Sequence, residues 1–135
     1  MSNGTTNLPK LIASMQPELQ PHIYVFAKTN DKTLATSLNP IMQFQEPEAT
    51  TLILRQTIAK KHSLDHEFPC RMITLKIHSS LQAVGFLALI TSHLAKHNIA
   101  VNPVSGFYHD HLFIAHDKAE QAMTALAELT TNPIS

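Results

Sequence analysis

The stretch CRMITLKIHSSLQAVGFLALITSHLAKH, residues Cys70–His97, decides the fold because its hydrophobic periodicity changes midway. Over Cys70–His78 apolar and polar residues alternate, which predicts a half-buried strand. Residues 79–97 then show helical spacing, with Ser79 or Ser80 as the N-cap. The apolar stripe of this predicted helix consists of Val84, Leu87, Ile90, Leu94 and Ala95. The stretch therefore predicts a strand that leads directly into a helix.

Two more strands and a second helix are predicted after this stretch. The strands cover 98–105 and 107–115, and Ser105–Gly106 between them suits a tight turn of an antiparallel hairpin. The helix covers 116–130, with Asp117 as its cap and Glu120 completing a capping box. The order is strand, helix, strand, strand, helix, and one more strand would complete a ferredoxin-like βαββαβ unit.

The first half of the chain repeats parts of this order more weakly. The predicted elements are a short helix, two strands and a last helical turn or two, at 7–15, 21–29, 49–55 and 56–62. Aligned with the second half, they leave 30–48 as an insertion rich in Asn, Pro and Thr. We therefore predict a tandem repeat, with a degenerate copy over 1–69 and a second copy over 70–135. The strand at 70–78 can complete either copy.

Composition and charge exclude several functional classes. The 135 residues are 44% hydrophobic, enough for one compact domain or two very small ones that share a core. The formal net charge is zero and there is no Lys/Arg run, which argues against a nucleic-acid or anionic-membrane partner. The longest apolar run, AVGFLALI, is too short to span a bilayer.

The single cysteine and the N-terminal residues bear on the compartment. Cys70 cannot form an internal disulfide, which is typical of a reducing environment. The N-terminus MSNGTTNLPK lacks the charged and then apolar build of a signal peptide. We therefore expect a cytoplasmic protein.

The run GFLALITSHLAKHNIAV, Gly85–Val101, resembles an ACT domain, a small ferredoxin-like regulatory module that binds amino acids. It contains, in the order typical of the family, a glycine, a leucine, and the pair LA before an isoleucine that opens the next strand. HDHLFI, residues 109–114, is similar to aspartokinase-like variants in which an acidic residue precedes a short apolar strand. TLKIHSSLQAVGF beside GFYHDHLF resembles small uncharacterised bacterial proteins built as two ACT-like repeats. The resemblance covers 70–130 well and 8–68 more weakly. It implies an α+β fold of two βαββαβ units, with antiparallel sheets covered by helices on one face.

Asp110 is the predicted centre of a ligand site. Strand alternation places it on one face with Leu112 and Ile114, so it lies near Ser79 and Gly85 if that face meets the helices. A carboxylate there can accept a hydrogen bond from a ligand ammonium, while serine hydroxyls or helix-end amides hold the ligand's carboxylate. The family resemblance places ligands at this turn, where a glycine leaves room. The predicted ligand-binding residues are His78, Ser79, Ser80, Leu81, Val84, Gly85 and Asp110. Alternatively, Asp110 only pairs with His78 or a backbone amide.

The histidines of the hairpin are predicted on the opposite face. His109 and His111 are spaced i, i+2 and with His78 could bind zinc, but one cysteine and no paired motif make no recognised zinc framework. The uncovered face mixes apolar and polar groups, which favours a homodimer. Its predicted interface residues are Lys76, Phe107, His109, His111 and Phe113. His93 and His97 have the i, i+4 spacing of zincin ligands, but the glutamate of H-E-x-x-H is missing, which favours a solvated or interface flank.

No enzyme and no cofactor are predicted. His78, Ser79 and Asp110 do not form a triad motif, because the three glycines of the chain offer no nucleophile elbow. The preferred function is a non-catalytic sensor of a small amino acid or related metabolite, bound at a repeat or subunit interface. The alternatives are an interaction domain without a small ligand and a metal-binding protein that uses His78, His109 and His111.

Overall fold

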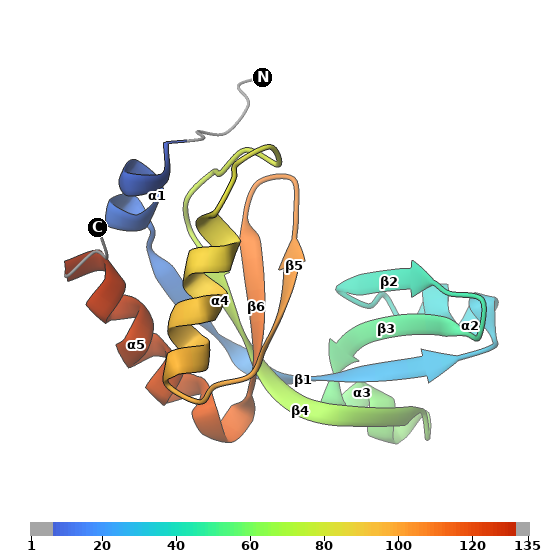
Figure 1. Cartoon of the computed structure of the whole chain (residues 1–135). Coiled ribbons are helices and arrows are strands. Elements are labelled where there is room, and N and C mark those ends of the chain that lie inside the picture. The colour runs from blue at the N-terminus through green and yellow to red at the C-terminus, as the bar shows by residue number, and fades with distance from the viewer. Residues whose placement is uncertain (1–6, 132–135) are drawn as a thin grey trace. The chain divides into compact units, whose positions relative to one another are not determined.

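The structure, a computed structural model, describes residues 7–131, which form two compact units. Within these residues, unit 1 comprises 7–21 and 71–131, and unit 2 comprises 22–70. Two long strands, β1 (Pro17–Thr29) and β4 (Asp65–Leu75), pass from one unit into the other (Figure 1). Each unit therefore contains a part of both strands.

Unit 1 is a four-stranded sheet with helices on one face (Figure 1). Its strand order is β1-β4-β6-β5, and β5 (Val101–Ser105) pairs antiparallel with β6 (Asp110–Ala115). The helices are α1 (Leu8–Ser14), α4 (Phe86–Lys96) and α5 (Ala119–Thr131), the last preceded by a 3-10 turn, η1 (His116–Lys118).

The core of unit 1 is apolar and lies between these helices and the sheet. Leu112 and Ile114 of β6 are fully buried there, as the alternation along 107–115 predicted for the helix-facing side. The other core residues come from the three helices, from β4, and from the residues just after α1 and α4. They are Leu11, Ile12, Met15, Ile73, Leu75, Phe86, Ile90, Leu94, Ile99, Ala122, Ala125, Leu126 and Leu129.

Unit 2 has the same architecture with shorter elements. Its strand order is β2-β3-β1-β4, with β2 (Met42–Gln45) and β1 both antiparallel to β3 (Thr50–Arg55). Its helices are α2 (Lys32–Ser37) and α3 (Gln56–Lys61). Its core is smaller and consists of Val25, Ala27, Ala35, Leu52, Leu54, Ala59 and Leu64.

The predicted α+β fold of two ferredoxin-like repeats is confirmed, but the alignment of the repeats was wrong. The order strand, helix, strand, strand, helix occurs as β1-α2-β2-β3-α3 and again as β4-α4-β5-β6-α5. Residues 30–48, predicted as an insertion, contain α2 and β2, the first copy's own helix and strand. With six and four residues these elements are too short to show a periodicity. The division of the sequence at 69/70 stays a prediction about the repeats, since each compact unit contains a part of both β1 and β4.

Two predicted boundaries around α4 and β6 were also wrong. The helix begins at Phe86, not at residue 79, and Val84 of the expected stripe is 86% exposed. The hairpin turn is longer than the predicted pair, because residues 106–109 join β5 to β6 and the Gly106 N–H donates to His109 O. Asn98, just after the end of α4, has a φ of 59°, the left-handed conformation that asparagine tolerates where a helix stops.

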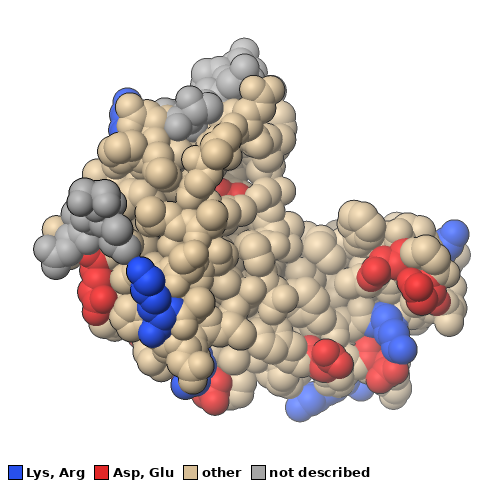
Figure 2. Space-filling model, in the orientation of Figure 1, with Lys and Arg blue, Asp and Glu red and all other residues tan. Residues whose placement is uncertain are grey.

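The surface agrees with the neutral composition. On the face that Figure 2 shows, Lys/Arg and Asp/Glu side chains form small groups of both signs and no extended basic area. Among residues 7–131, none of the helices combines the length and the apolar character needed to cross a membrane.

Candidate functional site

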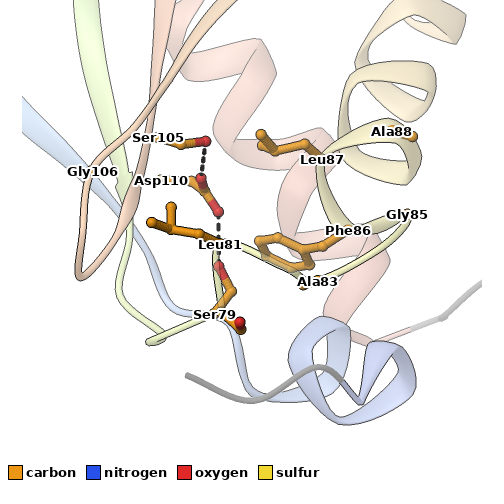
Figure 3. A pocket seen from close by; sticks show the side chains of 11 residues that line it. Ser79, Leu81, Ala83, Gly85, Phe86, Leu87, Ala88, Ser105, Gly106 and Asp110 are labelled. Atoms are coloured by element: carbon orange, nitrogen blue, oxygen red, sulfur yellow. Dashed lines mark hydrogen bonds between the residues drawn. The ribbon is translucent and has the colours of Figure 1, made fainter. Parts of the chain in front are cut away.

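A cavity of about 180 Å³ opens in unit 1 beside the start of α4 (Figure 3). Three segments form its wall: the loop that precedes α4, the first turn of α4, and the β5–β6 hairpin. The residues that line it are Ser79, Ser80, Leu81, Ala83, Gly85, Phe86, Leu87, Ala88, Ser105, Gly106 and Asp110. Sites for drug-sized ligands begin at about 300 Å³, so this cavity suits a smaller molecule.

Asp110 is the charged side chain in the wall of this cavity. It is the first residue of β6 and is 6% exposed. Its Oδ1 accepts a hydrogen bond from Ser105 Oγ at 2.7 Å and its Oδ2 accepts one from Ser79 Oγ at 3.0 Å (Figure 3). Both donors are neutral, and within the described part of the chain no cationic side chain forms an ion pair with Asp110. A buried carboxylate held only by hydroxyl groups favours a cationic group beside it.

The first turn of α4 gives the cavity a second polar element. Phe86, Leu87 and Ala88 line the cavity, and the first intrahelical hydrogen bond of α4 runs from Leu89 N to Gly85 O. The backbone N–H groups of its first residues have no intrahelical partners, and no side chain caps the helix to bond them instead. These groups and the positive end of the helix dipole favour an anion. Cation-binding and anion-binding groups therefore share one cavity.

Gly85 occupies its position because of backbone conformation. Its φ of 92° lies in the left-handed region, which residues with a Cβ adopt only under strain. A Cβ built there would lie 3.6 Å from Leu8 Cδ2, an ordinary van der Waals distance. Glycine is therefore needed at this position for its positive φ, and not, as the sequence argument had it, because a missing side chain leaves room for a ligand.

Five of the seven predicted ligand-binding residues line the cavity, and His78 and Val84 do not. The ring of His78 lies against Tyr108, with centroids 5.5 Å apart, and also near Phe107. The alternative pairing of Asp110 with His78 is not observed, since the bonds to Asp110 come from serines. His78, Ser79 and Asp110 also lack the Ser–His contact of a hydrolase, because the Ser79 hydroxyl donates to Asp110.

Several cavity residues were missed by sequence reasoning. Ser105 is the most important, because it bonds Asp110 directly across the hairpin. Its role depends on the pairing of Ser105 with Asp110, which a turn at Ser105–Gly106 does not allow. Gly106 lies in the same hairpin turn. The others lie on α4 and on the loop before it, at positions whose direction changed when the helix start moved to Phe86: Ala83, Phe86, Leu87 and Ala88.

The residues predicted for an interface have mixed environments. Phe113 is only 2% exposed, so it cannot belong to an uncovered face, and that part of the prediction was wrong. His111 is half-buried, and its Nδ1 lies 3.0 Å from Thr74 Oγ1. Burial lowers the pKa of His111, and the nearby His109 lowers it further, against an opposite effect of Asp110. Phe107 is exposed, His109 is half-buried, and Lys76 pairs with Glu18 at 3.9 Å.

His78, His109 and His111 do not form a metal site. Among residues 7–131, one group of at least three His, Cys, Asp or Glu side chains has all its donor atoms within 4.8 Å, and it contains none of these three. Cys70 offers no reactive thiolate, because burial raises its pKa to about 12 and its thiol donates to Tyr24 O.

Family models and solved structures agree with this architecture. Two models described as ACT domain match residues 3–71 and 67–128. A protein of unknown function from Vibrio cholerae, titled a possible transport protein, is 41% identical over 89% of this chain and 93% of its own, with a TM-score of 0.81. A protein from Agrobacterium tumefaciens is 13% identical over 86% of this chain and 89% of its own, with a TM-score of 0.73. The ligand-free regulatory subunit of aspartate kinase from Thermus thermophilus is 9% identical over 87% and 97%, with a TM-score of 0.58. A search of curated protein sequences finds no significant match.

Proposed function

This chain belongs to the ACT domain family, and on that premise we propose that it is a regulatory, non-catalytic module that binds a small amino acid in the cavity of unit 1. The observation that carries the proposal is the buried carboxylate of Asp110, which shares one small cavity with the uncapped first turn of α4. The fold shared with a regulatory subunit of aspartate kinase supports a regulatory role.

The two polar elements of the cavity match the two charges of an α-amino acid. The ammonium group of the ligand would donate hydrogen bonds to Asp110. These bonds would replace the hydration that the buried carboxylate has lost. The ligand carboxylate would accept from the free amides of Phe86, Leu87 and Ala88. The rest of the lining is apolar or hydroxylic, with Leu81 and Ala83 among it, so the ligand side chain is small and uncharged.

Binding would be coupled to conformation through the segments that the ligand joins. It would contact the loop before α4, the first turn of α4 and the β5–β6 hairpin, which are otherwise linked here by the Ser79–Asp110 hydrogen bond. A ligand that bridges these segments stabilises the arrangement in which they are close, and a partner protein can read that change.

An amino-acid panel in a thermal-shift assay tests the proposal. We expect one or a few small neutral amino acids to raise the melting temperature of the wild-type chain, and Asp110→Asn to abolish the rise because a neutral amide no longer attracts the ammonium group. The matched control is Asp65→Asn, which removes an exposed carboxylate that pairs with Lys28 in unit 2. An Asp110→Asn variant that responds like wild type would place the ligand elsewhere, and a panel without any response would contradict ligand binding.

An interaction domain without a small ligand is the second candidate function. It is favoured by large apolar side chains exposed around the cavity: Leu81, Val84, Phe107 and Tyr108. Such side chains are typical of surfaces that meet another protein, and we propose a second copy of this chain as that partner. Light scattering on the wild-type chain and on Phe107→Ser would separate a dimer that depends on this surface from a monomer.

A further inference from the structure

His93 of α4 and His97, the C-cap of this helix, lie next to Glu128 of α5, at the end of α4 that is remote in sequence from the cavity. The two imidazole rings are 4.7 Å apart between centroids. Glu128 Oε2 lies 3.4 Å from His97 Nε2 and 3.8 Å from His93 Nε2. The i, i+4 spacing of the histidines puts them on one face of α4, and α5 supplies the carboxylate.

The hydrogen bonds of His97 leave a lone pair directed at the carboxylate. His97 Nδ1 lies 3.0 Å from His93 O, and because a carbonyl oxygen only accepts, Nδ1 carries the proton. In neutral His97 the Nε2 atom then holds a lone pair and faces Glu128 Oε2. Two acceptors at this distance repel unless a second ring proton or a metal cation lies between them. A ring whose other N–H donates to a backbone carbonyl is the usual arrangement of a metal-bound histidine.

His93 has a nitrogen that the protein leaves without a partner. It is 9% exposed, its Nε2 lies 2.9 Å from Ala125 O, and its buried Nδ1 makes no hydrogen bond. A structural histidine in such surroundings usually has both nitrogens bonded. In the structure Nε2 donates to this carbonyl, so Nε2 can bind a metal only if the ring proton moves to the unpartnered Nδ1. Ala125 O would then keep the helical hydrogen bond that its position inside α5 provides.

We propose that His93, His97 and Glu128 bind a divalent transition-metal ion, with zinc as the best match, and thereby connect α4 to α5. Two atoms about 2.0–2.1 Å from a tetrahedral zinc ion lie about 3.3–3.4 Å apart, close to the 3.4 Å and 3.8 Å that separate Glu128 Oε2 from His97 Nε2 and His93 Nε2. Two imidazoles and one carboxylate are a common protein ligand set for zinc, and they leave the fourth position to water. His93 lies in the last turn of α4 and His97 is its C-cap, where the negative end of the helix dipole favours a cation.

The site is separate from the proposed amino-acid cavity, and its role is structural. The cavity uses the first turn of α4, whereas the metal uses the last turn. A metal bound only by the folded state stabilises it by mass action, so zinc would hold together α4 and α5, two of the three helices that cover the core of unit 1.

The test uses the whole chain without a histidine tag, freed of metal with EDTA and then titrated with zinc chloride. We expect one zinc ion per chain by calorimetry and a rise in melting temperature of about 5 °C or more at saturation. Cobalt(II) in place of zinc is expected to give the intense visible absorption of a four-coordinate site. His97→Ala and Glu128→Gln should each weaken zinc binding at least about tenfold. Glu128→Gln is nearly isosteric on a half-exposed side chain, so it leaves the fold intact.

The matched control is His62→Ala. His62 and His66 have the same i, i+4 spacing in sequence, but His62 ends α3 and His66 lies on β4, so no helix face joins them. His62→Ala and Asp110→Asn should bind zinc like wild type, which separates this site from the cavity. No stabilisation by zinc, or binding that is equal in Glu128→Gln and wild type, would overturn the proposal.

Discussion

The two units repeat the same hairpin but differ in the side chain at its most buried polar position. In unit 1, Ser105 ends β5 and Asp110 begins β6, and the two side chains form a hydrogen bond. In unit 2, Gln45 ends β2 and Thr50 begins β3, again five residues apart and again joined by a side-chain hydrogen bond, at 2.8 Å. Thr50, 1% exposed, thus takes the place of Asp110. The topology provides the position in both units, and one residue decides whether it carries a charge.

The helices beside these hairpins also differ between the two units. In unit 1, α4 has eleven residues and an uncapped first turn, whereas α2 of unit 2 has six residues and its N-terminus is capped by the Asp31 side chain. Among the described residues the apolar core has fifteen members in unit 1 and seven in unit 2. Unit 1 therefore has the buried carboxylate, the uncapped helix start and the larger core, whereas unit 2 keeps the framework without these groups.

Core truncations should show the largest difference between the units. Leu126→Ala in unit 1 removes a fully buried side chain from the larger core, and we expect it to lower the free energy of unfolding by about 4 kcal/mol. Leu54→Ala in unit 2 should cost about 2–3 kcal/mol, because a smaller core leaves fewer contacts to lose. Urea unfolding followed by circular dichroism measures both. A larger loss for Leu54→Ala would reverse the comparison.

Exchanging the two hairpin residues tests the comparison directly. Thr50→Asp puts a carboxylate where one glutamine is the partner, and it should destabilise the chain by about 1–3 kcal/mol. Asp110→Thr removes a buried charge and should change the free energy of unfolding by less than about 1 kcal/mol while it abolishes the amino-acid response. Equal losses for both variants in urea unfolding would mean that the two positions are not equivalent.

Gly85→Ala should cost about 1–2 kcal/mol, because alanine is strained at a φ of 92° while the space for its Cβ is free. The control is Asn98→Gly at the other end of α4, where φ is 59° and glycine removes strain instead of adding it. Asn98→Gly should therefore be neutral or slightly stabilising. A loss for Gly85→Ala no larger than that of Asn98→Gly would show that the start of α4 can adopt another conformation.

The smallest expected effect is a pH dependence that arises in unit 1. The pKa of His111 is lowered in the folded chain by burial and by His109. As the pH falls below about 6.5, His111 is therefore protonated in the unfolded chain before it is protonated in the folded chain. The contribution of neutral His111 to the free energy of unfolding is thus fully present above pH 6.5, and it is lost as the pH falls through the pKa of His111 in the folded chain. Melting temperatures between pH 8 and 5 should fall less for His111→Asn than for wild type. The exposed His116, changed to Asn, serves as the control.

Much of the cavity followed from local patterns in the sequence. Alternation along β6 placed Asp110 on the side of Leu112, and five of the seven predicted residues line the cavity around it. The start of α4 was missed because the loop before it has helix-like apolar spacing, while the left-handed Gly85 ends that loop. Ser105 was missed because its bond to Asp110 depends on a turn two residues longer than predicted.

The sequence by itself determined the fold class, the strand and helix of the second repeat, and the face on which Asp110 lies, since period-two and period-3.6 patterns are local properties of the chain. Only the tertiary structure decided that α2 and β2 belong to the first repeat, because elements of six and four residues take their conformation from packing. It also decided that Glu128 meets His93 and His97, which lie 35 and 31 residues before it in the chain. Such contacts depend on how helices pack on a sheet, which no local pattern records.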